Sequence, residues 1–221
     1  MARSSTTVAA AACVVVAVLA SAVAATPRPA DLFPTAVQVR AKFDDAAFVI
    51  DTTKIEGNPN HAGNIRGINQ GAFPVLGLPE VDSSLALISL AENAHNLPHT
   101  HPRASETLLL LKGKLEVFIV EENGPGDVRV IENTIRPGGV AVFPKGLLHG
   151  QRCVARDGCK GAAVLGSGDP GVITVSARLC DAPVEAVAAA LGVPEGVATR
   201  VCDRISGNPG AGQPAKDKHR R

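Results

Sequence analysis

The chain has 221 residues, enough for one domain with its own hydrophobic core. Hydrophobic residues make up 45% of it and charged residues 19%, and the net charge is +1, so the composition argues against a nucleic-acid or anionic-membrane partner. The chain has no tryptophan or tyrosine, which argues against aromatic platforms that stack on bases or sugars and against mechanisms that need a redox tyrosine.

Residues 1–25 have the pattern of a secretory signal peptide. Arg3 gives a positive start, residues 8–20 form an apolar run, and residues 22–24 offer small side chains for cleavage. The apolar run is shorter than the about 20 residues that span a bilayer. We therefore expect a secreted, extracellular protein that has no membrane segment after cleavage.

The stretch that follows has little regular pattern. Residues 36–48 could form a short helix, although their apolar spacing is loose. Residues 58–71 are rich in glycine and asparagine and predict a loop with one short strand. His61 lies in this loop without other metal-ligand types around it, so we interpret it as an exposed polar residue.

Residues 84–174 predict short strands separated by turns. Glycine, proline and asparagine mark turns at residues 112–113, 123–126, 137–139 and 166–171. The β-rich runs are residues 85–90, 106–111, 115–120, 128–131, 140–143, 161–165 and 172–175. Many short strands at this spacing favour an all-β jelly roll or barrel over a parallel sheet with helices.

A pair of histidines is the first sign of a functional site. His99 and His101 are two residues apart, which puts both side chains on one face of a strand but about 200° apart on a helix. Glu106 has the opposite parity, so it can join them only if the chain turns in between. Pro102 interrupts the strand at a suitable place for that turn.

A third histidine completes the candidate site. We assign His149 to a second apolar run, residues 140–143, which could lie antiparallel to the first strand. Three imidazoles and one carboxylate would then converge, which indicates a divalent metal site rather than a catalytic triad. Nitrogen and oxygen ligands with open positions suit Mn²⁺ or Fe²⁺, whereas a closed tetrahedral Zn²⁺ site has no free position.

The cysteines predict disulfides. Cys13 lies in the leader, and the four that remain form an even set in an oxidising compartment. Of the three pairings, we favour Cys153 with Cys159, which closes a small hairpin, and Cys180 with Cys202, which joins two helices. In an alternative, Cys153 is a further metal ligand, although a thiolate suits zinc or copper better than manganese.

The end of the chain changes from strands to helices. Residues 183–191 predict a helix with Pro183 near its first turn and Gly192 just after it, and residues 194–204 predict a second helix. Residues 206–221 lack apolar spacing, so we expect a disordered tail. The mature protein is then a single domain, residues 26–205.

Two motifs in the strand region resemble those of cupins. The pattern G-x5-H-x-H-x4-E-x6-G is matched within residues 93–113 and G-x5-P-x-G-x2-H-x3-N within residues 138–153. The matching residues are His99, His101, Glu106 and Gly113 in the first motif, and Gly138, Pro144, Gly146 and His149 in the second. The phrases HTHPRASE and FPKGLLH resemble germin-like proteins in particular, and this likeness extends over about residues 30–205.

Three features depart from the family pattern. Asn93 stands where the first motif has a glycine, a mild change because asparagine tolerates left-handed backbone better than most residues. Cys153 replaces the last asparagine of the second motif, and the early disulfide pair of the family is absent.

The resemblance implies a fold, a cofactor and an assembly. The fold would be a double-stranded β-helix, the cupin jelly-roll barrel, with short C-terminal helices. The cofactor would be Mn²⁺, with Fe²⁺ as the lesser alternative, held by His99, His101, Glu106 and His149 and open to a small anion or a dioxygen species. The chain would form a homo-oligomer, a hexamer by resemblance, in the apoplast or cell wall.

Three functions remain open. The resemblance favours superoxide dismutase-like redox activity, followed by oxalate oxidation. Germins that resemble oxalate oxidases have two asparagines near the metal; Asn96 matches one, but Ala86 stands at the other and has no amide. A missing orienting hydrogen bond weakens the case for oxalate oxidation. The third reading is a non-catalytic extracellular metal-binding or wall-associated protein, in which the metal stabilises the barrel.

Overall fold

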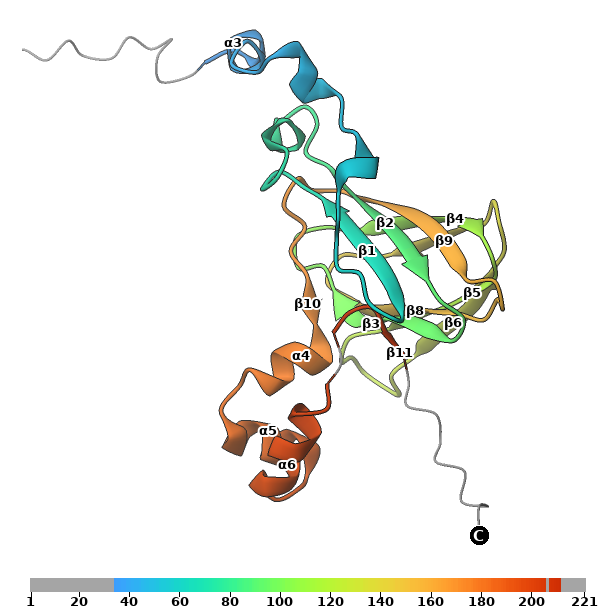
Figure 1. The fold of residues 1–221 in the computed structure, drawn as a ribbon. Coiled ribbons are helices and arrows are strands. Elements are labelled where there is room, and N and C mark those ends of the chain that lie inside the picture. Colours follow the sequence, from blue (N-terminus) through green and yellow to red (C-terminus); the bar gives the residue numbers. More distant parts are fainter. Residues whose placement is uncertain (1–33, 206, 212–221) are drawn as a thin grey trace, which may run out of the picture. The chain divides into compact units, whose positions relative to one another are not determined.

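The computed structural model describes residues 34–205 and 207–211 (Figure 1). The chain divides after Asp44 into two compact parts. The first contains α3 (Ala36–Arg40), which begins with a capping box between Thr35 and Gln38. The helix expected over residues 36–48 therefore ends earlier, and the rest of that stretch contributes a short 3₁₀ turn, Asp45–Phe48. The expected signal peptide lies outside the described residues.

The second part is built on two antiparallel sheets that enclose a common core (Figure 1). The first sheet has the order β1-β2-β9-β4-β7. Its strands are β1 (Gly63–Ile68), β2 (Ser84–Leu90), β9 (Cys159–Leu165), β4 (Glu106–Lys112) and β7 (Val140–Phe143). The second sheet has the order β10-β3-β8-β5-β6, with β11 also paired to β3. Its strands are β10 (Ile173–Thr174), β3 (Ala94–Thr100), β8 (Leu148–Cys153), β5 (Leu115–Val120), β6 (Val130–Ile135) and β11 (Gly210–Ala211).

Strand β4 shows how the sequence pattern builds the core. Glu106, Leu108 and Leu110 are buried, whereas Leu109 and Leu111 between and after them are exposed. Side chains alternate between the two faces of a strand, so the inward residues form one row. Each fully buried leucine stabilises the fold by about 1.5–3 kcal/mol relative to an exposed one. The same row ends in the carboxylate Glu106, which is therefore fixed at the inner wall of the barrel.

The histidine-bearing strand pairs differently from the expectation. β3 pairs antiparallel with β8, which places His99 opposite His149, whereas the run at residues 140–143 is a separate strand, β7, that pairs with β4. A turn separates β7 from β8, because Pro144 lacks a backbone N–H and Gly146 adopts a positive φ of 83°. His149 belongs to the strand that begins after this turn.

The C-terminal helices follow the sheets. α4 (Val175–Cys180) begins inside the run expected as a strand over residues 172–175, so β10 is only two residues long. α5 (Val184–Leu191) ends at Gly192, whose φ of 64° provides a left-handed cap, and α6 (Glu195–Cys202) packs against it. Among the described residues, no helix is long and apolar enough to cross a membrane.

Both favoured disulfides are confirmed. Cys153 pairs with Cys159 across the turn that leads from β8 in one sheet to β9 in the other, and Cys180 of α4 pairs with Cys202 of α6. Cys153 is therefore not a metal ligand, because its sulfur is already bonded.

Part of the expected disordered tail is ordered. Gly210 and Ala211 form β11, which pairs with Ala94 and His95 of β3. Residues 212–221 lie outside the described residues. The segment after the last helix thus returns to the strand that carries the histidines.

Candidate metal centre

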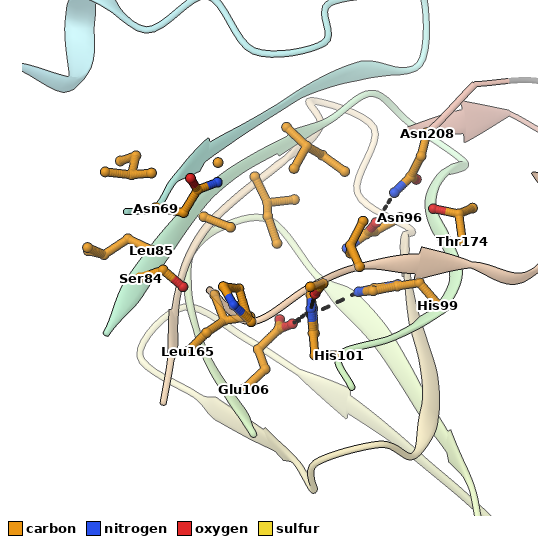
Figure 2. Close-up of a pocket in the computed structure, with 18 of the residues that line it drawn as sticks. Asn69, Ser84, Leu85, Asn96, His99, His101, Glu106, Leu165, Thr174 and Asn208 are labelled. Carbon is orange, nitrogen blue, oxygen red and sulfur yellow. Dashed lines mark hydrogen bonds and ion pairs between the residues drawn. The ribbon is translucent and has the colours of Figure 1, made fainter. Parts of the chain in front are cut away.

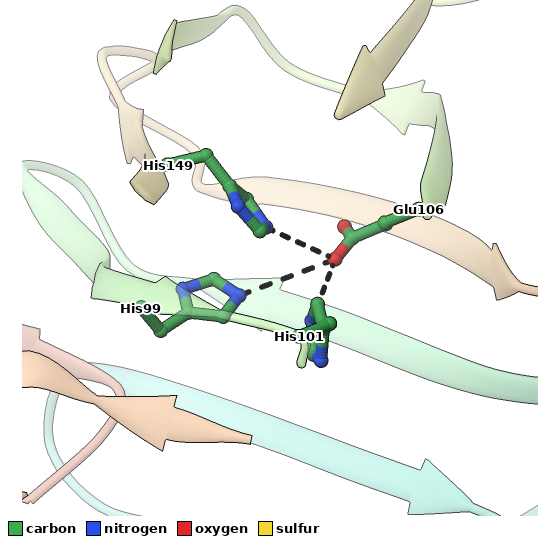
Figure 3. Close-up of side chains that lie close together, drawn as sticks. All are labelled: His99, His101, Glu106 and His149. Atoms are coloured by element: carbon green, nitrogen blue, oxygen red, sulfur yellow. Dashed lines mark hydrogen bonds and ion pairs between the residues drawn. The ribbon is translucent and has the colours of Figure 1, made fainter. Parts of the chain in front are cut away.

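Four buried side chains meet inside the barrel: His99, His101, Glu106 and His149 (Figure 3). One carboxylate oxygen, Oε2 of Glu106, lies 3.0 Å from Nε2 of His101, 3.4 Å from Nε2 of His149 and 4.0 Å from Nε2 of His99. The four candidate ligand atoms all lie within 4.8 Å of one another. Two ligands of one ion, each about 2 Å from it, are at most roughly 4–4.5 Å apart, so little adjustment would bring all four onto one metal.

The turn between β3 and β4 brings the glutamate to the histidines. His101 directly follows β3, and Glu106 begins β4 in the other sheet. Thr100 Oγ1 donates to the carbonyl of Gly146 at 2.7 Å, and the N–H of Gly146 donates to the carbonyl of His101 at 3.1 Å. These bonds tie the end of β3 to the turn before His149, so the two motifs are fixed against each other.

The other ring nitrogen of each histidine has a backbone partner. Nδ1 of His99 lies 2.7 Å from the carbonyl of Leu97, and Nδ1 of His149 lies 2.9 Å from that of Leu147. Nδ1 of His101 lies 2.6 Å from the carbonyl of Gly171. A carbonyl can only accept, so every Nδ1 carries the proton and, in the neutral ring, every Nε2 has a free lone pair.

This proton arrangement fits a cation. Three Nε2 lone pairs and a carboxylate face one another, and none of these groups can donate unless a ring is protonated. Oε1 of Glu106 is also buried and makes no hydrogen bond to a described residue. A divalent metal would bind all these acceptors at once, and the backbone carbonyls would hold the rings in the orientation that coordination needs.

The pKa values of His99 and Glu106 indicate the charge that each carries in the cluster. Burial, reinforced by the neighbouring His149, lowers the pKa of His99 to about 4 despite the nearby Glu106 carboxylate. For Glu106, burial alone would raise the pKa, but the close contacts of Oε2 with His101 and His149 and the nearby His99 outweigh it and lower the pKa to about 2. At neutral pH, His99 is therefore neutral and Glu106 is charged, which are the states a metal requires.

Packing also fixes His149. The ring of Phe143 stacks on it with centroids 4.4 Å apart and planes 18° from parallel. Phe143 is 1% exposed, so the imidazole rests against the core rather than against solvent.

A cavity of about 400 Å³ opens beside the cluster (Figure 2). Its wall includes His99, His101 and Glu106, together with apolar side chains that come mostly from the first sheet. The apolar part of the wall consists of Ile65, Ile68, Leu85, Ala86, Ile88, Leu165 and Val172. Among the described residues that line it, none is a lysine or arginine. The volume is in the range of small-molecule sites.

Asn96, which the resemblance to germins places near the metal, lines this cavity. It lies three residues before His99, a spacing that would put the two side chains on opposite faces of a regular strand. The register between β3 and β8 shifts between these residues, so three steps on β3 match two on β8. Such a bulge turns both side chains inward, and Pro98 is tolerated there because a bulge needs fewer ladder bonds.

Sequence reasoning missed three polar residues near the site. Gln151 is two residues after His149 on β8, so strand parity could have placed it inside. Ser84 shares a face with Ala86 and has a buried hydroxyl without a partner among the described residues. Asn208 also lines the cavity, but its glycine- and proline-rich surroundings give no periodic signal.

A cupin family model matches residues 53–196, about two thirds of the chain, and contains all four cluster residues. The chain therefore belongs to the cupin family. Within it, the resemblance to germin-like proteins is confirmed. Germin-like protein subfamily 1 member 7 of Arabidopsis thaliana is 38% identical over 131 residues, which cover 58% of this chain and 56% of that protein. Germin-like protein 4-1 of Oryza sativa subsp. japonica is 39% identical over 127 residues, or 56% of this chain and 50% of that protein. The match thus spans little more than half the length of these relatives.

Solved structures agree with the expected jelly-roll barrel. A structure of oxalate oxidase is 26% identical with a TM-score of 0.66 and covers 75% of this chain and 83% of that one. Oxalate oxidase in complex with the substrate analogue glycolate gives the same identity, TM-score and coverage. The coconut allergen cocosin, at 20% identity and a TM-score of 0.60, shares the fold alone; it covers 69% of this chain and 40% of that one.

Proposed function

We propose that the protein is a secreted manganese-binding cupin with superoxide dismutase-like redox activity. The observation that carries the proposal is the convergence of three Nε2 lone pairs and the Glu106 carboxylate in a buried cluster. Nitrogen and oxygen donors that leave positions open suit Mn²⁺, with Fe²⁺ as the lesser alternative. Bound manganese would supply one-electron redox chemistry and an open position for a small anion.

The charge of the cavity favours a singly charged anion. A divalent ion and the Glu106 carboxylate leave one net positive charge. Asp169, the other acidic residue of the wall, is paired with Arg103 at 2.7 Å. With no lysine or arginine among the described lining residues, one negative charge is balanced and a second is not. Superoxide carries one charge, and oxalate carries two.

Oxalate oxidation is the second candidate. It is favoured by the likeness to oxalate oxidase, including the glycolate complex. Ala86 lines the cavity at the position where an amide is expected, and its methyl group cannot hydrogen-bond a carboxylate. The apolar wall around it would leave the second carboxylate of oxalate poorly solvated. We therefore rank this activity below dismutation.

A non-catalytic role is the third candidate. A hydrogen bond to a backbone carbonyl holds each imidazole in place. A metal bound by these rings and Glu106 would therefore also link β3, β4 and β8 to one another. In that case metal binding would stabilise the barrel by mass action without turnover.

The assay that separates these candidates uses manganese-loaded protein. Its rate of superoxide consumption is compared with that of the Glu106→Gln variant, and oxalate-dependent peroxide formation is measured in parallel. Dismutation predicts superoxide consumption above that of free Mn²⁺ and little peroxide from oxalate. Peroxide formation from oxalate without superoxide consumption would favour oxalate oxidation. If the protein consumes neither superoxide nor oxalate, the binding role is favoured.

The location and assembly are also proposals. Two disulfides support an oxidising, extracellular setting such as the apoplast or cell wall. We propose a homo-oligomer, with a hexamer as the resemblance implies. Its support is an apolar outer face on the first sheet, where Val140, Val142 and Val164 are 52%, 60% and 52% exposed.

A further inference from the structure

The segment after the last helix forms part of the wall of the metal cavity. Asn208 lines the cavity (Figure 2), and Gly210 and Ala211 pair with the start of β3. Pro209 between them is fully buried, and its carbonyl accepts a hydrogen bond from Nδ2 of Asn60 at 2.8 Å. The segment is thus anchored directly after Asn208.

Asn208 has only one consistent orientation. Its Oδ1 lies 2.8 Å from the backbone N–H of Leu97, which can only donate. The Nδ2 of Asn208 must then face the other way, toward Oδ1 of Asn96 at 2.7 Å. The choice between the two amide orientations is set by a backbone group and is not ambiguous.

The same logic fixes the next two amides. Because Oδ1 of Asn96 accepts from Asn208, its Nδ2 faces Gln151 and donates to Oε1 at 2.7 Å. Nε2 of Gln151 is then left buried without a partner among the described residues. Three amides therefore form a chain with one direction, which begins at the N–H of Leu97.

We propose that Asn208 is a positioning residue that sets the orientation of the Asn96 amide and thereby the group that Asn96 offers to a ligand. The Asn96 amide has two N–H groups, and Gln151 uses one. The second remains for a ligand with an acceptor oxygen, such as a small carboxylate or an oxyanion beside the metal. The orientation does not depend on a bound metal; the ligand contact rests on the proposed function.

The substitution Asn208→Asp tests the direction of the chain. One carboxylate oxygen still accepts from Leu97, but the other can only accept and so repels Oδ1 of Asn96. The Asn96 amide should turn over, present Nδ2 to the new carboxylate and direct Oδ1 toward Gln151. The Gln151 amide would turn over with it, so that its Nε2 gains the partner that it lacks in the native chain.

Neutron diffraction from crystals of the metal-free protein reads this orientation directly, because it distinguishes a deuterated amide nitrogen from oxygen. We expect Asn96 with Nδ2 toward Gln151 in the native chain and with Nδ2 toward position 208 in Asn208→Asp. The same Asn96 orientation in both proteins, or the reverse one in the native chain, overturns the proposal. This measurement needs no metal, so it is independent of the proposed function.

A second readout is glycolate affinity of the manganese-loaded protein, measured by calorimetry. The matched control is Asn69→Asp, which adds the same charge to the cavity wall and keeps the bond that Oδ1 accepts from Gly71. Loss of a hydrogen bond to a charged ligand predicts about tenfold weaker binding in Asn208→Asp than in Asn69→Asp. Equal affinities in the two variants would overturn the claim that the Asn96 orientation acts on the ligand. Native protein that holds no manganese would instead contradict the proposed function, and the ligand contact with it.

Discussion

At the residue scale, each histidine of the cluster has a defined role for both ring nitrogens. Nδ1 is engaged by a backbone carbonyl, which leaves Nε2 for the centre of the cluster. The protein thus stabilises an arrangement in which acceptors face acceptors, which costs free energy until a cation binds.

Replacement of His101 or His149 by alanine should remove most of the bound metal. Each change deletes one of four donors and leaves a buried gap that water or another ligand must fill. Metal content per chain, measured by elemental analysis, should fall to a small fraction of the native value. His61→Ala is the matched control, because His61 is exposed and outside the cluster. Native manganese content in either cluster variant would refute the ligand assignment.

The metal-free protein should lose stability in acid in two steps. The pKa of His99 is about 4 in the fold and 6.5 in a free side chain, so the unfolded chain binds more protons between these values and stability falls as the pH drops from 6.5 to 4. The pKa of Glu106 is about 2 in the fold and 4.5 free, so a second loss follows between pH 4.5 and 2. Each step is worth roughly 3 kcal/mol.

Urea titrations in the presence of chelator at a series of pH values measure these losses. An unfolding free energy that stays flat from neutral pH to pH 4 would contradict the protonation states assigned to the cluster.

Some of the site could be predicted from residues alone, and some could not. The spacing of His99, His101 and Glu106 is a local signal, because strand parity and one proline constrain where they point. Gln151 has such a signal too, in its parity with His149. Asn208 has none, because it reaches the site only through pairing of a distant segment with β3.

At the scale of elements, local pattern predicted most strands but not their partners. The apolar runs of β4 and β5 mark strands in the sequence, although the four successive leucines at residues 108–111 hide the alternation of buried and exposed side chains in β4. The pairing of β3 with β8 depends on a bulge and on a turn at Pro144, and the hydrophobic periodicity of the sequence predicts neither feature. The helix α4 was missed because its β-branched start also suits a strand, and propensity alone does not decide between them.

The pair of helices α5 and α6 should depend on the disulfide that joins α4 to α6. α5 and α6 share a small buried cluster, Val187, Ala188 and Ala198, which is too few side chains to stabilise two short helices strongly. Replacement of both Cys180 and Cys202 by serine reopens a span of 22 residues and should cost about 3 kcal/mol of local stability.

Hydrogen exchange in α5 and α6 measures that loss. Metal content should stay at the native level, because the helices contribute no cluster residue. Unchanged exchange in the variant would show that packing alone holds the pair.

At the scale of the whole molecule, the outer face of the first sheet resembles a core rather than a surface. Val142, Thr107 and Val164 lie side by side in the register of β7, β4 and β9, and Val140, Leu109 and Ala162 form the next row. Exposed apolar rows of this kind are typical of an interface. The expected homo-oligomer would cover them with a second copy of the chain.

Val142→Lys should therefore shift the protein to a smaller assembly. A charge in the middle of a buried interface is costly, whereas on a free surface it changes stability by at most about 0.5 kcal/mol. Light scattering after size exclusion gives the mass of native and variant protein. Glu132→Lys, which introduces the same residue at an exposed position of β6 in the second sheet, is the control. A monomeric native protein would contradict the proposed assembly.

Elemental analysis of the protein, purified without added metal and without chelator, tests the metal assignment most directly. The arrangement of His99, His101, Glu106 and His149 predicts about one manganese ion per chain. Zinc, iron or no metal would leave the cupin barrel intact but would contradict the manganese assignment and the redox function that depends on it.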